Sequence, residues 1–91
     1  LFIEAPDGDV ASFCTIWLDE ENRYANLEPV GTRQEYQGMG LGRALLREAF
    51  RRMAANGATR TFMESANPFY HRVGFRKTPY ARSAWIRYFR A

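Results

Sequence analysis

The sequence feature that most constrains the fold is a run of three glycines at alternate positions, Gly38, Gly40 and Gly42, directly before a segment with helical periodicity. Glycine adopts backbone conformations that other residues avoid, and it lets the chain approach a ligand closely. The first amides of a helix have no partner within the helix and lie at the positive end of its dipole. The pattern therefore predicts a phosphate-binding loop at the N-terminus of a helix.

The segment after these glycines has the pattern of an amphipathic helix. Its apolar residues recur at helical spacing: Leu41, Ala44, Leu45, Leu46, Ala49, Phe50 and Met53. The opposite face is mostly basic, with Arg43, Arg47, Arg51 and Arg52. Asn56-Gly57 is a typical C-terminal cap, because glycine accepts the left-handed conformation that ends many helices. We therefore predict a helix from Leu41 to this cap.

Segments with strand composition lie on both sides of the predicted helix. Apolar, β-branched and aromatic residues dominate the ranges 1–5, 10–18, 24–30, 59–64 and 84–89. The polar connection 19–23 predicts that the second and third of these form an antiparallel hairpin. Pro29 cannot donate to a ladder, so it predicts a bulge or a point where neighbouring strands part.

A short second helix is expected between Asn67-Pro68 and Gly74, and a strand then begins at Phe75 and is interrupted by Pro79. Strands therefore precede, separate and follow the helices. This order predicts an α/β fold, a mixed sheet with helices packed against it, in one domain over residues 1–91.

The glycine loop fits neither of two common phosphate motifs. A P-loop requires Gly-Lys-Ser/Thr, but Gly42 is followed by Arg43-Ala44, and a dinucleotide motif requires glycine where Arg43 stands. The loop Gln37-x-x-Gly40-x-Gly42 instead resembles the (Q/R)-x-x-G-x-(G/A) motif of the GCN5-related N-acetyltransferases, the GNAT family. Residues 27–36 resemble the end of that family's fourth strand and its loop, and Tyr70-x-x-x-Gly74-Phe75 resembles its Y-x-x-x-G-F signature. The resemblance covers roughly residues 10–78.

This resemblance implies the acyl-CoA N-acyltransferase fold and the transfer of an acetyl group from acetyl-CoA to a primary amine on a small molecule or peptide. It implies a coenzyme site at Val30, Thr32, Gln37, Gly38, Met39, Gly40, Leu41, Gly42, Arg43 and Asn67, with Arg33 as an additional charge. Arg43 is equally interpreted as a solvated helix residue. The family's usual pantetheine-binding asparagine corresponds to Met63 here, which leaves Ser65 or Asn67 for that contact, or Asn67 as a helix cap.

The resemblance also implies the catalytic groups. The Val30 N–H would stabilise the oxyanion, since Pro29 has no proton to give, and Tyr70 would be the general acid for the departing thiolate. A packing role for Tyr70 is the alternative. The resemblance fixes no position for the base. Glu28, a carboxylate in the strand beside the predicted gap, is the candidate, and a structural or substrate-binding role is its alternative. Glu64 or ordered water is the other candidate for the base. His71 is expected to be a surface residue.

Two further function classes remain. One is a non-catalytic acyl-CoA-binding domain or sensor of the same fold. The other is a nucleic-acid-binding module, because the net charge is +3 and the C-terminal segment interleaves aromatic and basic residues: Tyr80, Arg82, Trp85, Arg87, Tyr88 and Arg90. The 10 acidic residues offset this charge and the spacing fits a terminal strand, so we expect no nucleic-acid partner.

The chain begins with Leu1, and a complete GNAT domain begins with a strand and two helices that have no counterpart here, so we expect a truncated domain. The uncovered apolar surface then favours a homodimer or cover by the missing N-terminal part. Cys14 is the only cysteine, which excludes an internal disulfide or cysteine-based metal site; we expect a half-buried thiol and no metal. With no apolar run near the ~20 residues of a membrane span, we expect a cytoplasmic protein without a membrane partner.

Overall fold

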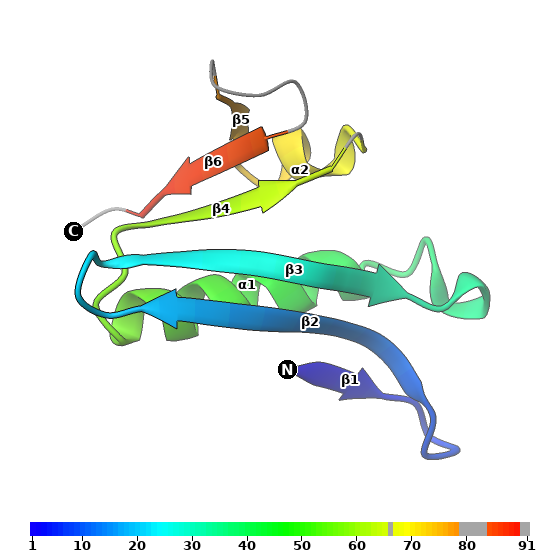
Figure 1. Ribbon diagram of the computed structural model, residues 1–91. Helices are drawn as coiled ribbons and strands as arrows, with labels where there is room; N and C mark the ends of the chain where they lie inside the picture. Colours follow the sequence, from blue (N-terminus) through cyan, green and yellow to red (C-terminus); the bar gives the residue numbers. More distant parts are fainter. Residues whose placement is uncertain (66, 79–83, 90–91) are drawn as a thin grey trace.

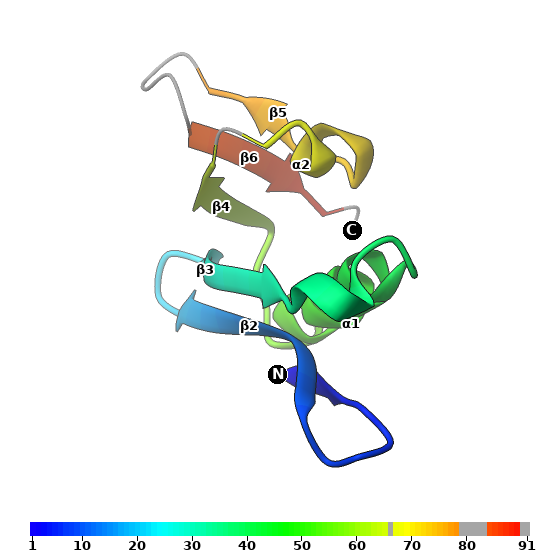
Figure 2. The ribbon, with the colours of Figure 1, turned by 90° about the vertical axis from the view of Figure 1, so that its right-hand side faces the viewer.

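The computed structural model describes residues 1–65, 67–78 and 84–89. Within them, six strands form one sheet in the order β1-β2-β3-β4-β6-β5, and Figure 2 shows both helices on the same side of it. The elements are β1 (Phe2–Glu4), β2 (Val10–Asp19), β3 (Tyr24–Thr32), a 3-10 turn at Gln34–Tyr36, α1 (Leu41–Ala55), β4 (Arg60–Glu64), α2 (Phe69–Arg72), β5 (Arg76–Lys77) and β6 (Ala84–Tyr88). The predicted mixed α/β architecture is confirmed. The predictions for Pro79, Tyr80, Arg82 and Arg90 concern residues outside the described ranges.

Among the described strands, β3 and β4 form the single parallel pair, and α1 connects them. All other pairings of these strands are antiparallel. A helical crossover is the ordinary way to join two parallel neighbours. Figure 1 shows α1 lying along β2 and β3, so that its N-terminus comes next to the end of β3. This arrangement places the glycine loop beside the carboxyl end of β3, at one end of the sheet.

The core lies between α1 and the sheet. The buried residues of α1 are Leu45, Leu46, Ala49, Phe50 and Met53. They pack with Cys14, Ala25, Leu27, Met63, Phe75 and Trp85 from the sheet side. Burying a large apolar side chain of this kind contributes about 1.5–3 kcal/mol. Two predictions fail here: Ala44 is exposed, because its position on α1 faces away from the sheet, and Cys14 is buried at 2% exposure.

The strands β3 and β4 part beyond the first third of β3. Only Tyr24, Ala25 and Asn26 pair with β4, whereas β3 continues to Thr32. The β2–β3 register also shifts between Cys14 and Ile16, opposite Glu28-Pro29. Figure 1 shows the two strands diverging toward their carboxyl ends. Both alternatives predicted for Pro29, a bulge and a parting of strands, are thus present.

No described helix covers the opposite face of the sheet. Cross-strand pairing aligns Trp17, Asn26 and Phe62 on this bare face. Large apolar side chains remain exposed there, including Phe2 at 59% and Trp17 at 63%. None of the described helices is long and apolar enough to cross a membrane.

Candidate active site

The glycine loop has the backbone geometry that its sequence predicted. Gly38 and Gly40 have φ values of 80° and 79°, in the left-handed region, and Gly40 is the N-cap of α1. Side chains at such positions are strained by about 1–2 kcal/mol. Gly42 serves differently: a Cβ there would lie 3.6 Å from the Phe69 ring, an ordinary contact. The first two glycines therefore set the backbone, whereas the third lies within ordinary contact distance of α2 and leaves room for a Cβ.

The amides of residues 38–43 have no hydrogen-bond acceptor among the described residues. The Ala44 amide donates to the Gly40 carbonyl at 3.1 Å, so the run of unpaired amides ends at residue 43. The Gln37 side chain donates to the Thr32 carbonyl at 3.1 Å and ties the loop to the end of β3. Free amides at the start of a 15-residue helix are a ready-made anion site.

A cleft of about 760 Å³ opens beside this loop, between the end of β3, the start of α1 and α2. Its lining includes nearly all of the predicted coenzyme residues: Val30, Thr32, Gln37, Gly38, Gly40, Leu41, Gly42, Arg43 and Asn67, together with Tyr70. Met39 is 65% exposed and contributes no lining side chain, although its amide belongs to the free run.

Arg33 does not reach the cleft. Its guanidinium pairs with Asp9 at 3.0 Å and Glu35 at 3.3 Å, so it is unavailable as an additional charge beside a pyrophosphate. The expectation for Arg33 is therefore not supported by the geometry, because two nearby carboxylates hold it on the other side of the loop.

The Val30 amide is directed into the gap between β3 and β4. The Cys14 amide and carbonyl both bond to Leu1, at 2.9 and 3.1 Å, so Cys14 faces Val30 as a non-hydrogen-bonded pair. In such a pair the backbone groups of both residues point away from each other. The pairing of β3 with β4 ends at Asn26, so the Val30 N–H has no hydrogen-bond acceptor on a described neighbouring strand.

Tyr70 lines the same cleft from α2. Its ring stacks on Phe69 at a centroid distance of 5.3 Å and meets the edge of Phe75 at 6.0 Å. Its hydroxyl makes no hydrogen bond with the described residues. Burial, and then the nearby Cys14 thiolate, raise the pKa of Tyr70 above its ordinary value of 10, so the hydroxyl holds its proton at neutral pH.

A profile of the acetyltransferase (GNAT) family matches residues 1–75. The chain belongs to this family. Among solved structures it is similar to the GNAT family N-acetyltransferase YhbS of Escherichia coli in complex with CoA, with 17% identity, a TM-score of 0.80, and cover of 96% of this chain and 56% of that one. It is also similar to a GNAT-family acetyltransferase of Staphylococcus aureus Mu50, with 14% identity and a TM-score of 0.87. That match covers 98% of this chain and 66% of that one.

Nourseothricin acetyltransferase gives 26% identity and a TM-score of 0.77, with cover of 91% of this chain and 59% of that one. The chain thus spans between 56% and 66% of the length of these three proteins. A search of curated proteins returns no relative. The likenesses establish the GNAT fold that the sequence predicted.

The α2 region departs from the usual GNAT pattern as the sequence indicated. Met63 is buried in the core. The Asn67 side chain accepts a hydrogen bond from the Phe69 amide at 2.9 Å, while the Asn67 amide donates to the Ser65 hydroxyl at 3.0 Å. Asn67 thus acts at the start of α2 while still lining the cleft. Its carbonyl amide oxygen is occupied, which leaves the NH₂ group for a ligand.

Glu28 lies on the bare face of the sheet, away from the coenzyme cleft. A separate groove of about 440 Å³ is lined by Trp17, Asn26, Glu28, Phe62, Met63, Glu64 and Ala84. The Trp17 indole donates to the Glu28 carbonyl at 3.0 Å and fixes the strand beside the bulge. Both candidate bases therefore belong to this groove, while Tyr70 lines the cleft on the other side.

Sequence reasoning missed several cleft residues, namely Gly31, Tyr36, Leu46, Phe69, Arg72 and Val73. Phe69 and Val73 flank Tyr70 at positions four apart, and that spacing was a usable signal, since such residues share one face of a helix. The pair of hydroxyls Ser12 and Thr32, 2.9 Å apart, had no comparable signal, because it depends on the register of β2 and β3. His71 is exposed, as predicted.

Proposed function

We propose that this chain binds acetyl-CoA and takes part in transferring its acetyl group to a primary amine. The observation that carries the proposal is one cleft that joins free amides at the start of α1 to the Val30 N–H and the Tyr70 hydroxyl. Acetyl-CoA presents a pyrophosphate, a thioester carbonyl and a sulfur leaving group, and the cleft offers a donor for each. Membership of the GNAT family and the CoA complex of the E. coli relative support this assignment.

In the proposed reaction the amine nitrogen attacks the thioester carbonyl carbon, and the carbonyl oxygen becomes an oxyanion near the Val30 N–H. The carbon–sulfur bond then breaks, and the Tyr70 hydroxyl gives its proton to the departing sulfur. The attacking nitrogen releases a proton to solvent as the intermediate collapses, so the products are an amide and the free thiol, and solvent returns a proton to Tyr70. Tyr70 is protonated at neutral pH, because burial raises its pKa from an ordinary value that is already about 10, so a proton is present when the thiolate leaves.

The acceptor enters from the bare face in this proposal. The groove there carries Glu28 and Glu64 beside the aromatic rings of Trp17 and Phe62, a surface that attracts a cationic amine. The amine must lose a proton before attack, and we assign this step to Glu28, directly or through water. In this proposal the amine reaches the thioester where β3 and β4 part, because no ladder bonds join the two strands beyond Asn26.

Binding calorimetry with coenzyme A tests the anion loop. Gly40→Val places a β-branched residue at a φ of 79°, which we expect to weaken binding by at least about 30-fold through loss of the amide alignment. Gly42→Ala is the matched control, because its Cβ makes only ordinary contacts, and we expect affinity within about threefold of the parent. Thermal melts verify that both variants fold. Equal affinity of parent and Gly40→Val would remove the loop from the coenzyme site.

A screen of amine acceptors with the full-length gene product, read as thiol release from acetyl-CoA, tests catalysis separately. Release that depends on an amine supports the proposed transfer. Tight binding of acetyl-CoA with no release for any amine would identify a non-catalytic acyl-CoA-binding domain or sensor instead.

A further inference from the structure

A second, smaller cavity adjoins the coenzyme cleft and has a cationic lining. It measures about 310 Å³ and lies where α1, the end of α2 and β6 meet. Its lining residues are Arg43, Arg47, Phe50, Arg72, Val73, Gly74 and Arg87. Arg43, Arg72 and Val73 also line the cleft, so the two spaces are neighbours that share these residues. No carboxylate lines this cavity, which we call the arginine pocket.

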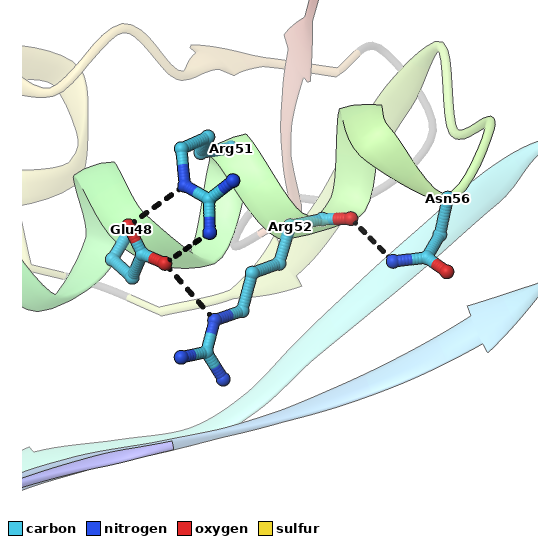
Figure 3. A network of polar contacts seen from close by, with 4 residues as sticks. All are labelled: Glu48, Arg51, Arg52 and Asn56. Carbon is cyan, nitrogen blue, oxygen red and sulfur yellow. Dashed lines mark hydrogen bonds and ion pairs between the residues drawn. The ribbon is translucent and has the colours of Figure 1, made fainter.

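None of the four arginines of the pocket has an anionic partner among the described residues. Arg43 and Arg47 are four residues apart on α1, on one face of the helix, and neither forms an ion pair or hydrogen bond there. The next turn of the same helix is different. Figure 3 shows Arg51 and Arg52 both bonded to Glu48, at distances of 2.6 to 3.0 Å. Positive charge is thus neutralised on one face of α1 and left free toward the pocket.

Arg87 is already held in position. Its Nε donates to the Val73 carbonyl at 3.1 Å, and its guanidinium carbon lies 4.5 Å from the centre of the Phe50 ring. Gly74 makes room for it, since a Cβ at that position would come within 2.6 Å of Nε. The terminal guanidinium nitrogens have no acceptor among the described residues. A fixed guanidinium with free donors is suited to a planar or tetrahedral oxyanion.

We propose that the arginine pocket binds the 3′-phosphate on the ribose of coenzyme A. The inference rests on the proposed function, which places the pyrophosphate on the amides of residues 38–43. Coenzyme A carries a second, separate phosphomonoester close to that pyrophosphate, with a charge of about −1.5 to −2 at neutral pH. Arg47 lies four residues, about 6 Å along the helix axis, beyond Arg43, so the pocket continues the anion site along α1.

The test compares coenzyme A with 3′-dephospho-coenzyme A by calorimetry at physiological salt, in the parent and in Arg47→Gln. Arg47 is exposed and unpaired, so we expect the variant to fold normally. The parent should bind coenzyme A about tenfold more tightly than the dephospho form. Arg47→Gln should lose about fivefold in affinity for coenzyme A and little for the dephospho form, so that the preference shrinks.

Arg51→Gln is the matched control, because it removes one charge from the same helix outside the pocket, and it should retain the full preference. Equal binding of both coenzymes by the parent overturns the phosphate assignment and leaves the proposed function intact. An equal loss of preference in Arg47→Gln and Arg51→Gln also overturns it, since the effect would then be general helix charge. If the parent binds neither coenzyme, both proposals are overturned.

Discussion

The two faces of the sheet build their candidate sites from different parts of the chain. On the helix-covered face, the donors are mainly backbone amides, those of residues 38–43 and Val30. On the bare face, the groove consists of side chains, with Glu28, Glu64 and Trp17 as its polar and aromatic groups. A site made of amides survives any substitution that preserves φ, whereas a site made of side chains changes with each one. The comparison indicates why one GNAT fold can keep its coenzyme while its acceptor varies.

The largest effect expected on the covered face comes from its one reactive side chain. In the full-length protein, Tyr70→Phe should lower kcat by roughly 10²–10⁴ and leave the affinity for acetyl-CoA nearly unchanged, because it removes a proton donor and keeps both ring contacts. Steady-state kinetics with calorimetry measure both quantities. His71→Gln, an exposed neighbour, is the control. A Tyr70→Phe enzyme with parental turnover would reduce Tyr70 to a packing residue.

The pH profile of the parent sharpens the same prediction. Tyr70 donates only when protonated, and burial raises its pKa above the ordinary value of 10, so the loss of kcat due to this group should have its midpoint above pH 10. Tyr70→Phe should lack that loss. The same shift affects folding stability. Because the pKa of Tyr70 is higher in the folded state, its contribution to the free energy of unfolding is present below pH 10. That contribution is lost as the pH rises through the folded-state pKa.

The covered face was also the more predictable one from sequence. Gly38 and Gly40 adopt a positive φ, and Pro29 has no amide proton. Each residue type limits its own backbone conformation or hydrogen bonding, so the local structure could be predicted without knowing the fold. The same holds for the period of α1. Arg33, Cys14 and Ala44 failed because their environments depend on tertiary placement: Asp9 reaches Arg33 from another segment, and the fit of α1 on the sheet decides what is buried.

The bulge explains why the position of Glu28 was harder to foresee. In a regular strand, residues 28 and 30 would share a face. The extra residue at Glu28-Pro29 shifts this alternation, so that Leu27 and Val30 both pack toward the core and Glu28 faces the groove. The proline predicted a bulge or a parting of the strands, but not which side chains it would redirect, because that depends on register with β2.

A smaller effect is expected from the acids of the bare face. Glu28→Gln should lower kcat by about 10²-fold if it is the base, with little change in coenzyme affinity, because the groove is separate from the cleft. Glu64→Gln is the matched variant and should act mainly on the KM of a cationic acceptor. Kinetics with a fixed amine separate the two outcomes. A large loss of acetyl-CoA affinity in either variant would contradict the proposal that the coenzyme binds on the covered face and the acceptor on the bare face.

The smallest expected effect concerns association of the 91-residue chain through its bare face. The terminal strands β1 and β5 are short, with 3 and 2 residues, which disfavours pairing through the sheet edge. The paired residues Phe2 and Phe13 remain 59% and 41% exposed on the broad face instead. We therefore expect a dimer, and Phe2→Ser should weaken it by about tenfold, as the loss of one partly buried aromatic contact implies.

Met39→Ser is the control, because it removes an apolar side chain that is 65% exposed at the glycine loop, and it should leave the dimer unchanged. Analytical ultracentrifugation measures both dissociation constants. A folded monomer at tens of micromolar would show that the bare face is compatible with water, and that its aromatic residues serve the acceptor groove alone.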